Sequence, residues 1–328
     1  MMRQGKAKGS QLINYLDGTL YHIDLKKADN IPTNLFLVGA AERVNAIAKH
    51  FNSVQFRHQN KARPEFNIIC GAYKGVPMAA MSCGIGVAGI EIALTELHAL
   101  WEFDPEKNRW SDTPASVNII RVGTAGTSLA DVPLGALAIS EYAIGLDNLG
   151  VFYPRRTLDV KMKDIARDFQ KTKIGTLINF FSGFCCYVSP ANSSIVSALG
   201  RMAVREFLKN GESVRAVASG ITTASPGFFA PEGRTVGRIQ TLFSMEDFIE
   251  SMANFESGGL RIVNHEMETS ILFRLANEML GYRAGAICTV LDNLASDQMI
   301  DAAYAAERIG KCILVALEAM VELAGLRA

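Results

Sequence analysis

The sequence lacks an excess of charge of either sign. Its 328 residues carry 33 Lys and Arg against 33 Asp and Glu, so the formal net charge at pH 7 is zero. Proteins that bind nucleic acid or an anionic membrane through charge need a strongly basic surface, and this balance does not favour one. We therefore expect neither kind of partner. Recognition of a small anion would have to rest on a few well-placed arginines.

Paired cysteines and long apolar runs are also missing. The six cysteines form no C-x-x-C pair and most lie inside apolar stretches, which is typical of buried free thiols in a reducing compartment and not of disulfides or zinc sites. The most apolar stretch, residues 76–90, is shorter than the ~20 residues of a membrane-spanning helix. The basic, polar amino terminus does not resemble a signal peptide. These features predict a cytoplasmic protein without a metal site.

Apolar strands alternate with amphipathic helices along the chain. Short apolar runs predict strands at 20–25, 35–38, 66–73, 78–82, 117–122, 134–142, 214–219, 260–264 and 284–291. Apolar residues at helical spacing predict helices at 42–51, 89–101, 161–173, 195–209, 246–255, 267–280 and 301–324. This alternation predicts an α/β sandwich around a central sheet.

No internal repeat or linker divides the sequence, so residues 1–328 are expected to form one domain. Residues 1–34 are expected to be an extended N-terminal arm that contributes one short strand. The polar segment 104–114, with two prolines, is expected to be an inserted surface loop.

Two predicted strands lead to residues suited to anion binding. One is followed by Arg43, and another contains Arg121 and ends at Gly123 and Thr124. Ligands of open α/β sheets bind at the carboxyl ends of strands. Glycine gives access to backbone N–H groups, threonine donates a hydrogen bond, and a guanidinium group pairs with two oxygens. The residues alone leave two interpretations open: a cradle for a phosphate or carboxylate group, or an ordinary turn at the end of a strand.

Six motifs resemble segments of uridine phosphorylases and occur in the order found in that family. They are His-Ile-Asp-Leu at 22–25, Gly39 with Arg43, Ser-Cys-Gly-Ile-Gly at 82–86, Arg-Val-Gly-Thr-Ala-Gly at 121–126 with Asp-Val-Pro-Leu-Gly at 131–135, the segment 226–234, and Asn-His-Glu-Met-Glu-Thr at 264–269. The resemblance extends over residues 22–294. The chain is therefore similar to nucleoside phosphorylases of the uridine phosphorylase type over most of its length.

The resemblance implies a fold and an activity. The fold would be a three-layer α/β/α sandwich around a central mixed β-sheet. The reaction would be phosphorolysis of a ribonucleoside, uridine above all, to the free base and ribose 1-phosphate, with inorganic phosphate as co-substrate and no cofactor. Members of the family form homodimers or homohexamers of three dimers, so at least a homodimer is expected.

The resemblance also implies site residues. The implied phosphate ligands are Gly39, Arg43, Arg63, Arg121 and Thr124. The implied ribose ligands are Met267, Glu268 and His22, the last reaching the ribose of a neighbouring subunit. The implied base site comprises Phe228, Glu232, Arg234, Leu291 and Asp292. The groups implied to act in catalysis are Arg121, Glu268, Arg234 and Asp292.

These roles agree with the chemistry of glycosidic cleavage. A phosphate dianion held at the sugar carbon would serve both as nucleophile and as counter-charge to an oxocarbenium-like centre. Arg234 would stabilise negative charge on the departing base. Without the resemblance, Met267 fits a core methionine, His22 a surface residue and Glu268 a carboxylate at a helix N-terminus.

Several positions depart from the uridine phosphorylase pattern. Ala40 stands where an Asp is usual, and Leu294 where an Arg is usual. The arginine that the family donates across the subunit interface aligns with Pro64, although Arg63 is adjacent and could replace it. Glu232 stands where Gln is typical, and an ionised carboxylate can only accept hydrogen bonds.

Asp292 departs from the pattern in a different way, because uridine phosphorylases carry an apolar residue there. Its strand resembles that of hexameric purine nucleoside phosphorylases, in which an Asp protonates the purine; the structural alternative is a cap on the turn at Asn293. A purine or broad-specificity phosphorylase is thus the second hypothesis. A nucleosidase is disfavoured by Arg43 and Arg121, and a non-catalytic nucleoside-binding paralogue would bind ligand without turnover.

Overall fold

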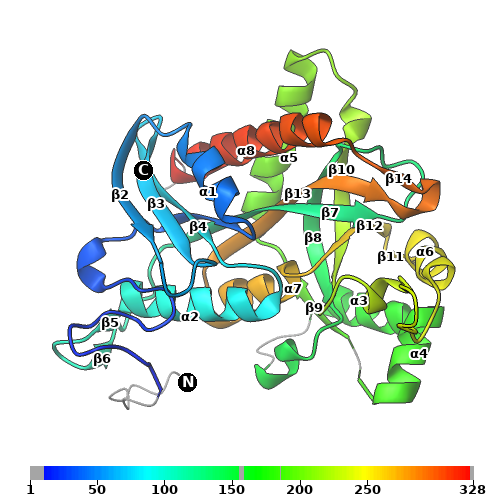
Figure 1. The fold of residues 1–328 in the computed structure, drawn as a ribbon, viewed down its shortest axis with the longest axis horizontal. Coiled ribbons are helices and arrows are strands. Elements are labelled where there is room, and N and C mark those ends of the chain that lie inside the picture. Colours follow the sequence, from blue (N-terminus) through cyan, green and yellow to red (C-terminus); the bar gives the residue numbers. More distant parts are fainter. Residues whose placement is uncertain (1–10, 155–158, 185, 326–328) are drawn as a thin grey trace.

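A twelve-stranded mixed sheet lies at the centre of the computed structural model, which describes residues 11–154, 159–184 and 186–325 (Figure 1). The sheet strands are β1 (Asn34–Val38), β2 (Ser53–Gln59), β3 (Asn67–Tyr73), β4 (Val76–Ser82), β7 (Asn118–Thr127), β8 (Leu137–Gly145), β9 (Tyr187–Pro190), β10 (Val217–Ala224), β11 (Glu256–Ser257), β12 (Leu260–Glu266), β13 (Arg283–Asn293) and β14 (Gln298–Met299). Their main order is β11-β12-β10-β8-β13-β7-β1-β4-β3-β2, with β14 beside β13 and β9 beside β8.

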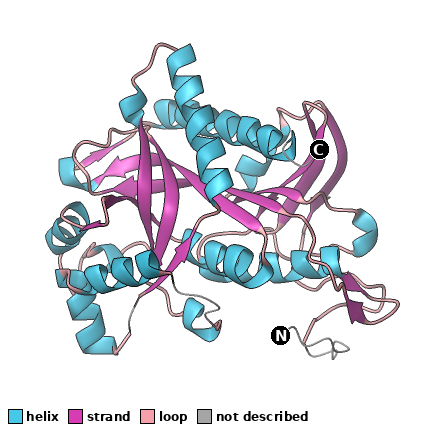
Figure 2. Ribbon diagram, turned by 180° about the vertical axis from the view of Figure 1, so that it is seen from behind, coloured by secondary structure: helices cyan, strands magenta, loops and turns pink. Residues whose placement is uncertain are grey.

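Helices cover both faces of the sheet, as Figures 1 and 2 show from opposite sides. The α-helices are α1 (Ala41–Ala48), α2 (Val87–Glu102), α3 (Val160–Gln170), α4 (Lys173–Ser182), α5 (Ser193–Lys209), α6 (Met245–Ala253), α7 (Thr269–Phe273) and α8 (Ala302–Gly325). Helices α1, α5 and α8 lie on one face, and α2 and α7 on the other. The predicted α/β sandwich with a mixed central sheet is confirmed.

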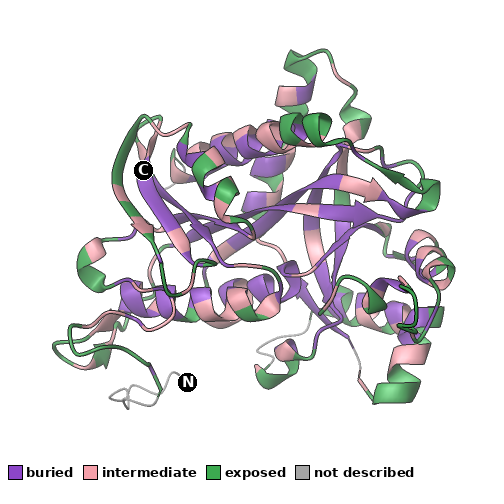
Figure 3. Cartoon of the chain, viewed as in Figure 1, coloured by how far each residue is buried: buried purple, intermediate pink, exposed green. Residues whose placement is uncertain are grey.

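Strand β1 shows why the sheet is buried on both sides. Its side chains alternate, so that Leu35 and Leu37 belong to the core beneath α2 and α7, whereas Phe36 and Val38 belong to the core beneath α5 and α8. All five residues of the strand are buried. A continuous apolar run is typical of a strand covered on both faces. Figure 3 shows this burial along the central strands and its loss at β2, the exposed edge strand.

Two sets of parallel strands meet at the part of the sheet that carries the polar motifs. Strands β1, β4, β7 and β13 run parallel to one another, and so do β8, β10 and β12. Strand β8 is antiparallel to β13, and β12 meets β7 in a single antiparallel pair, His265 with Gly126. This pair closes a ring of five strands, β7-β13-β8-β10-β12. It brings the carboxyl ends of β7 and β12 together.

The amino-terminal segment differs from its prediction. Residues 20–25 form turns with only an isolated bridge between Asn14 and Leu20, so the predicted strand is wrong. Leu20, Ile23 and other apolar side chains are buried in the core with α2, and the Glu96 carboxylate accepts backbone N–H groups of residues 22 and 23. Residues 20–34 are therefore packed against the core through Leu20, Ile23, Leu25 and Ile31 and are not an extended arm, whereas Ile13, Tyr15 and Leu16 are exposed. Residues 1–10 lie outside the described part.

Other boundaries also move. The predicted loop 104–114 contains a short ribbon, β5 (Phe103–Asp104) with β6 (Arg109–Trp110), which the stacking of Trp110 on His98 holds against α2. Strand β10 begins only after a 3-10 turn at Val214–Ala216, and α7 begins at Thr269 and continues as a π-helix, Arg274–Leu280. Strands β2 and β9 and helix α4 were not predicted.

Strand β7 is longer than predicted. The pattern at 123–126 suggested the end of a strand, yet pairing with β13 continues as far as Thr127. Five cysteines are buried, and Cys185 lies outside the described residues. No helix in the described part is long and apolar enough to cross a membrane.

A buried chain of hydrogen bonds joins β12 to β10 and β8. The Thr222 hydroxyl donates to Asn264 Oδ1 at 2.6 Å, so the Ser140 hydroxyl, also at 2.6 Å, must donate to Thr222. All three side chains are fully buried. Because an unpaired buried polar group is costly, this chain fixes β12 beside β10 at the first residue of the motif at 264–269.

We expect Thr222→Val to lower the free energy of unfolding by about 2 kcal/mol, because it leaves two buried polar partners unpaired without changing the side-chain volume. Thr223→Val is the matched control: Thr223 is equally buried, but its hydroxyl has no hydrogen-bond partner within the described residues. Urea unfolding of both variants measures the difference. Equal losses would contradict the proposed hydrogen-bond chain.

Candidate functional site

A cavity of about 940 Å³ opens where the two sets of strands converge. Its wall is built from segments that follow or end strands, namely 39–43 after β1, 84–85 after β4, 124–126 in β7, 228–234 after β10, 265–268 at the end of β12 and 291–299 at β13 and β14. The site therefore lies at the carboxyl ends of six strands, where the sequence predicted a ligand.

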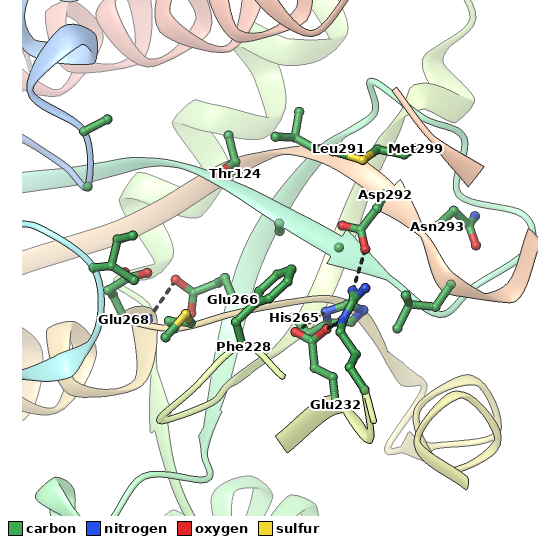
Figure 4. Close-up of a pocket in the computed structure, with 18 of the residues that line it drawn as sticks. Thr124, Phe228, Glu232, His265, Glu266, Glu268, Leu291, Asp292, Asn293 and Met299 are labelled. Carbon is green, nitrogen blue, oxygen red and sulfur yellow. Dashed lines mark hydrogen bonds and ion pairs between the residues drawn. The ribbon is translucent and has the colours of Figure 1, made fainter. Parts of the chain in front are cut away.

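The cavity has two polar ends. Figure 4 shows Glu268 at one end, Glu232 and Asp292 at the other, and Phe228 between them. Eleven of the thirteen predicted site residues line it: Gly39, Arg43, Arg121, Thr124, Phe228, Glu232, Arg234, Met267, Glu268, Leu291 and Asp292.

Arg121 is the central group of the first end. It is 3% exposed, its Nε donates to Glu266 at 2.9 Å, and one terminal nitrogen donates to Glu268. Burial alone would lower the pKa of Arg121, but the two carboxylates outweigh burial and raise it. The other terminal nitrogen, Nη1, is buried without a hydrogen-bond partner among the described residues. Arg121 is thus a fixed cation with a donor still to be satisfied.

Arg43 adds a second cation to this end. It projects from α1, and its guanidinium donates to the Val122 carbonyl at 3.2 Å. Burial, and then the charge of Arg121, lower the pKa of Arg43. Two neighbouring cations that disfavour each other are stabilised by an anion placed between them. With the Gly39 backbone and the Thr124 hydroxyl on the same wall, this end is suited to a dianion.

The carboxylates beside Arg121 are held by backbone N–H groups. Glu266 accepts from the N–H groups of Glu268 and Thr269, at 3.0 and 2.9 Å. Glu268 accepts from Gly86 N at 2.7 Å, and Gly86 has φ +94°, a conformation that L side chains rarely adopt. Burial raises the pKa of Glu266 to about 7; Arg121 opposes the shift and Glu268 adds to it.

The second end repeats the pattern with Arg234. Its Nε donates to Glu232 at 2.7 Å, and a terminal nitrogen donates to Asp292 at 2.8 Å, the contact dashed beneath Asp292 in Figure 4. The guanidinium also lies over the Phe228 ring, 4.6 Å from its centre. Burial alone would lower the pKa of Arg234, but the two carboxylates raise it. This end offers carboxylate acceptors, a cation and an aromatic face.

A bulge in β13 shapes this second end. The pairing of β13 with β7 shifts between Val290 and Asp292, so Leu291 has no partner in the register and both Leu291 and Asp292 line the cavity. Bulges commonly redirect side chains next to binding sites. Asp292 then pairs with Met299 of β14, while Asn293 caps the following turn through the N–H groups of Ala295 and Ser296.

His22 and Arg63 do not line the cavity of their own chain. Tyr21 holds the two side chains together: it contacts the His22 ring edge-on at 4.9 Å and the Arg63 guanidinium at 4.0 Å. His22 Nδ1 lies 2.5 Å from Glu96, and Arg63 donates to the Tyr21 carbonyl at 3.0 Å. The structure thus joins the two residues that sequence analysis assigned to subunit contacts.

Two residues that the sequence analysis left without a role are prominent in the structure. Glu266 anchors Arg121, and His265 is 2% exposed beside Glu232. The signal for both was their position inside the motif 264–269, at the end of a predicted strand. No cluster of three or more His, Cys, Asp or Glu side chains suited to a metal occurs within the described ranges.

Comparisons with known proteins give a consistent result. The model of the phosphorylase superfamily matches residues 35–322. A uridine phosphorylase of Thermococcus kodakarensis is 27% identical over 285 residues, which cover 86% of this chain and 80% of that protein. A solved nucleoside phosphorylase of Trypanosoma brucei that shows uridine phosphorylase activity superposes with a TM-score of 0.83 and 29% identity, covering 95% of this chain and 99% of that one.

More distant structures share the fold. A uridine phosphorylase of Phytophthora capsici has a TM-score of 0.68 at 20% identity, covering 93% of this chain and 95% of that one. A purine nucleoside phosphorylase of Toxoplasma gondii has a TM-score of 0.61 at 18% identity, covering 95% and 98%. At such identities the likeness extends to the fold alone.

The raised pKa of Glu266 predicts pH-dependent anion binding. Below about pH 7 Glu266 becomes protonated and no longer neutralises Arg121, so an anion of constant charge should bind more tightly as the pH falls. We expect sulfate to bind about tenfold more tightly at pH 6 than at pH 8, as measured by calorimetry. Glu266→Gln, which is uncharged at both pH values, should remove most of this difference. The same pH dependence in variant and wild type would rule Glu266 out as its source.

Proposed function

Because the chain belongs to the phosphorylase superfamily, we propose that it cleaves a ribonucleoside, uridine above all, by phosphorolysis to the free base and ribose 1-phosphate. The observation that carries the proposal is one cavity with arginines at both ends, Arg43 and Arg121 at one and Arg234 at the other. A nucleoside phosphorylase needs both, since phosphate attacks at one end of the substrate while charge develops on the base at the other.

Phosphate would bind between Arg43 and Arg121, with the Thr124 hydroxyl and the Gly39 backbone. The buried, unpaired Nη1 of Arg121 supports this placement, because a donor without a partner in the protein is satisfied by a ligand. The two arginines would orient the dianion towards the sugar carbon. Its charge would also stabilise the oxocarbenium-like centre as the glycosidic bond breaks.

The ribose would lie over Met267, with Glu268 accepting hydrogen bonds from its 2′ and 3′ hydroxyls. The contact of Glu268 with Gly86 N supports this role, because it holds the carboxylate at the cavity wall next to Arg121. Phosphate and ribose would then share one charge network. Glu268 is also a counter-ion of Arg121.

The base would lie against Phe228, with Glu232 and Arg234 at its edge. Negative charge that develops on the departing base would be stabilised by Arg234, whose own pKa stays high because Glu232 and Asp292 flank it. The names of the relatives from Thermococcus kodakarensis and Trypanosoma brucei favour uridine among nucleosides.

A homodimer or a larger assembly would complete the site. His22 and Arg63 both contact Tyr21 and do not line the cavity of their own chain, which supports their delivery as a pair to a neighbouring subunit. His22 would then contact the ribose and Arg63 the phosphate of the partner.

One observation favours a second candidate, a purine or broad-specificity phosphorylase. Asp292 lines the base end and is half-buried, and its Oδ2 is bound to Arg234. A carboxyl group there could donate a proton to a purine leaving group. Uracil leaves as an anion stabilised by Arg234 and has no need of this acid.

The first test follows the cleavage of uridine and inosine in parallel, with and without phosphate. We expect phosphate-dependent release of uracil and little release of hypoxanthine, because phosphate is the nucleophile and the relatives from Thermococcus kodakarensis and Trypanosoma brucei are described by their action on uridine. Cleavage without phosphate would indicate a nucleosidase, and binding without any cleavage would indicate a non-catalytic paralogue. Efficient inosine cleavage that is lost in Asp292→Asn, with uridine cleavage retained, would establish the second candidate.

Arg43→Ala tests the phosphate end. Removing one of two cations should raise the KM for phosphate by about tenfold or more and leave the KM for uridine within about twofold. Arg57→Ala is the matched control. Arg57 is exposed on β2 and lies outside the cavity, and its guanidinium donates to Asn45 of α1, the helix that also carries Arg43. Steady-state kinetics with each substrate varied in turn separate the two constants. An unchanged KM for phosphate would remove Arg43 from the phosphate site.

A further inference from the structure

The side chain of His265 is enclosed at the base end of the cavity. It lies on β12, pairs across the sheet with Gly126 of β7 and packs edge-on against Phe248 of α6 at 5.2 Å. A Cβ at Gly126 would lie 2.3 Å from His265 Cε1 and 2.7 Å from Asp292 Oδ1. Only glycine therefore leaves room for this imidazole beside Asp292, and the ring has little freedom to move.

Neither ring nitrogen of His265 has a hydrogen bond within the described part of the chain. A buried imidazole with unsatisfied nitrogens costs free energy, so its retention at a cavity wall calls for a reason other than packing. The nearest polar atom given for it is Glu232 Oε1, 3.3 Å from Nδ1, which is within ion-pair distance but without hydrogen-bond geometry. The other oxygen of Glu232 accepts from Arg234.

The charged groups around His265 form one chain. Glu232 faces Nδ1, Asp292 shares the space in front of Gly126, and Arg234 bridges these two carboxylates. The remaining neighbours, Phe248 and the register partner Thr223 of β10, carry no charge. Burial alone would raise the pKa of Glu232, but His265 and then Arg234 lower it. The carboxylate is thus kept ionised while nearly fully buried.

We propose that His265 is a positioning residue for the base: with Arg234 it holds the Glu232 carboxylate ionised and fixed, so that the site selects bases that donate a ring N–H. Uracil and hypoxanthine present such an N–H. Cytosine presents a bare ring nitrogen, whose lone pair would face the carboxylate and be repelled. This inference rests on the proposed function and adds a determinant of base class to it.

His265→Asn and His265→Leu form a matched pair for the test. Both remove the ring and have side chains with the same branching of heavy atoms, but only Asn retains an N–H donor towards Glu232. We expect Leu to raise the KM for uridine and the inhibition constant of free uracil by about tenfold, with the KM for phosphate unchanged and with discrimination against cytosine reduced. Asn should restore most of the loss. His265→Phe, which retains a ring against Phe248, is a second donor-free variant should Leu not fold.

The effect must also act through Glu232. In a Glu232→Gln background the Leu substitution should have little further effect, because the carboxylate that His265 positions is gone. Equal losses for Leu and Asn, or equal losses in both backgrounds, would show that His265 only fills space and would overturn the inference. A wild-type protein that cleaves no nucleoside and binds no uracil would instead refute the proposed function itself, and the inference with it.

Discussion

The guanidinium of Arg121 is buried in the middle of the sheet, so protein atoms or a ligand must balance its charge. Glu266 and Glu268 do so, and both come from the end of β12, a strand that touches β7 at one residue pair only. The ion pairs therefore hold the closed ring of strands at its weakest junction. They also place the motif at 264–269 against the anion end of the cavity, so that fold closure and ligand binding depend on the same charges.

At each end of the cavity an arginine pairs with two carboxylates, but the two arginines differ in burial and in how fully their donors are paired. Arg121 retains an unpaired buried donor, and Arg43 beside it has no ion pair with a carboxylate within the described residues, so both guanidinium groups can still bind an anion. Arg234 is half-buried between Glu232 and Asp292, and its charge is largely satisfied. A full dianion fits the first end. The second end suits a neutral base that acquires negative charge only as it departs, when a cation already in place costs no reorganisation.

The elements best predicted from the sequence are those whose local pattern and tertiary setting agree. The run of residues 35–38 is apolar on both faces because helices cover both faces, and its strand was predicted almost to the residue. The motif at 121–126 was predicted to end a strand, since glycine favours turns, but pairing with β13 carries β7 through it. The amino-terminal segment was predicted as an extended arm with one short strand, whereas Leu20, Ile23 and Leu25 in fact pack in the core under α2, a tertiary contact that the local sequence does not show.

The two ends of the site also differ in how well the sequence predicts them. At the anion end, Arg43, Arg121 and Thr124 lie in or next to segments predicted as strands or strand ends. The residues alone left an ordinary turn open, however, and the resemblance to uridine phosphorylases carried the assignment; the structure places all three on one cavity wall. The base end depends on the bulge at Leu291 and on the missing Cβ at Gly126, neither of which leaves a pattern in the sequence. The contacts proposed for His22 and Arg63 with another subunit involve a second chain, so neither the spacing of residues nor the fold of one chain predicts them. The residues proposed to bind phosphate are thus encoded close to strand ends, whereas those proposed to bind the base come from segments that meet only in the folded protein.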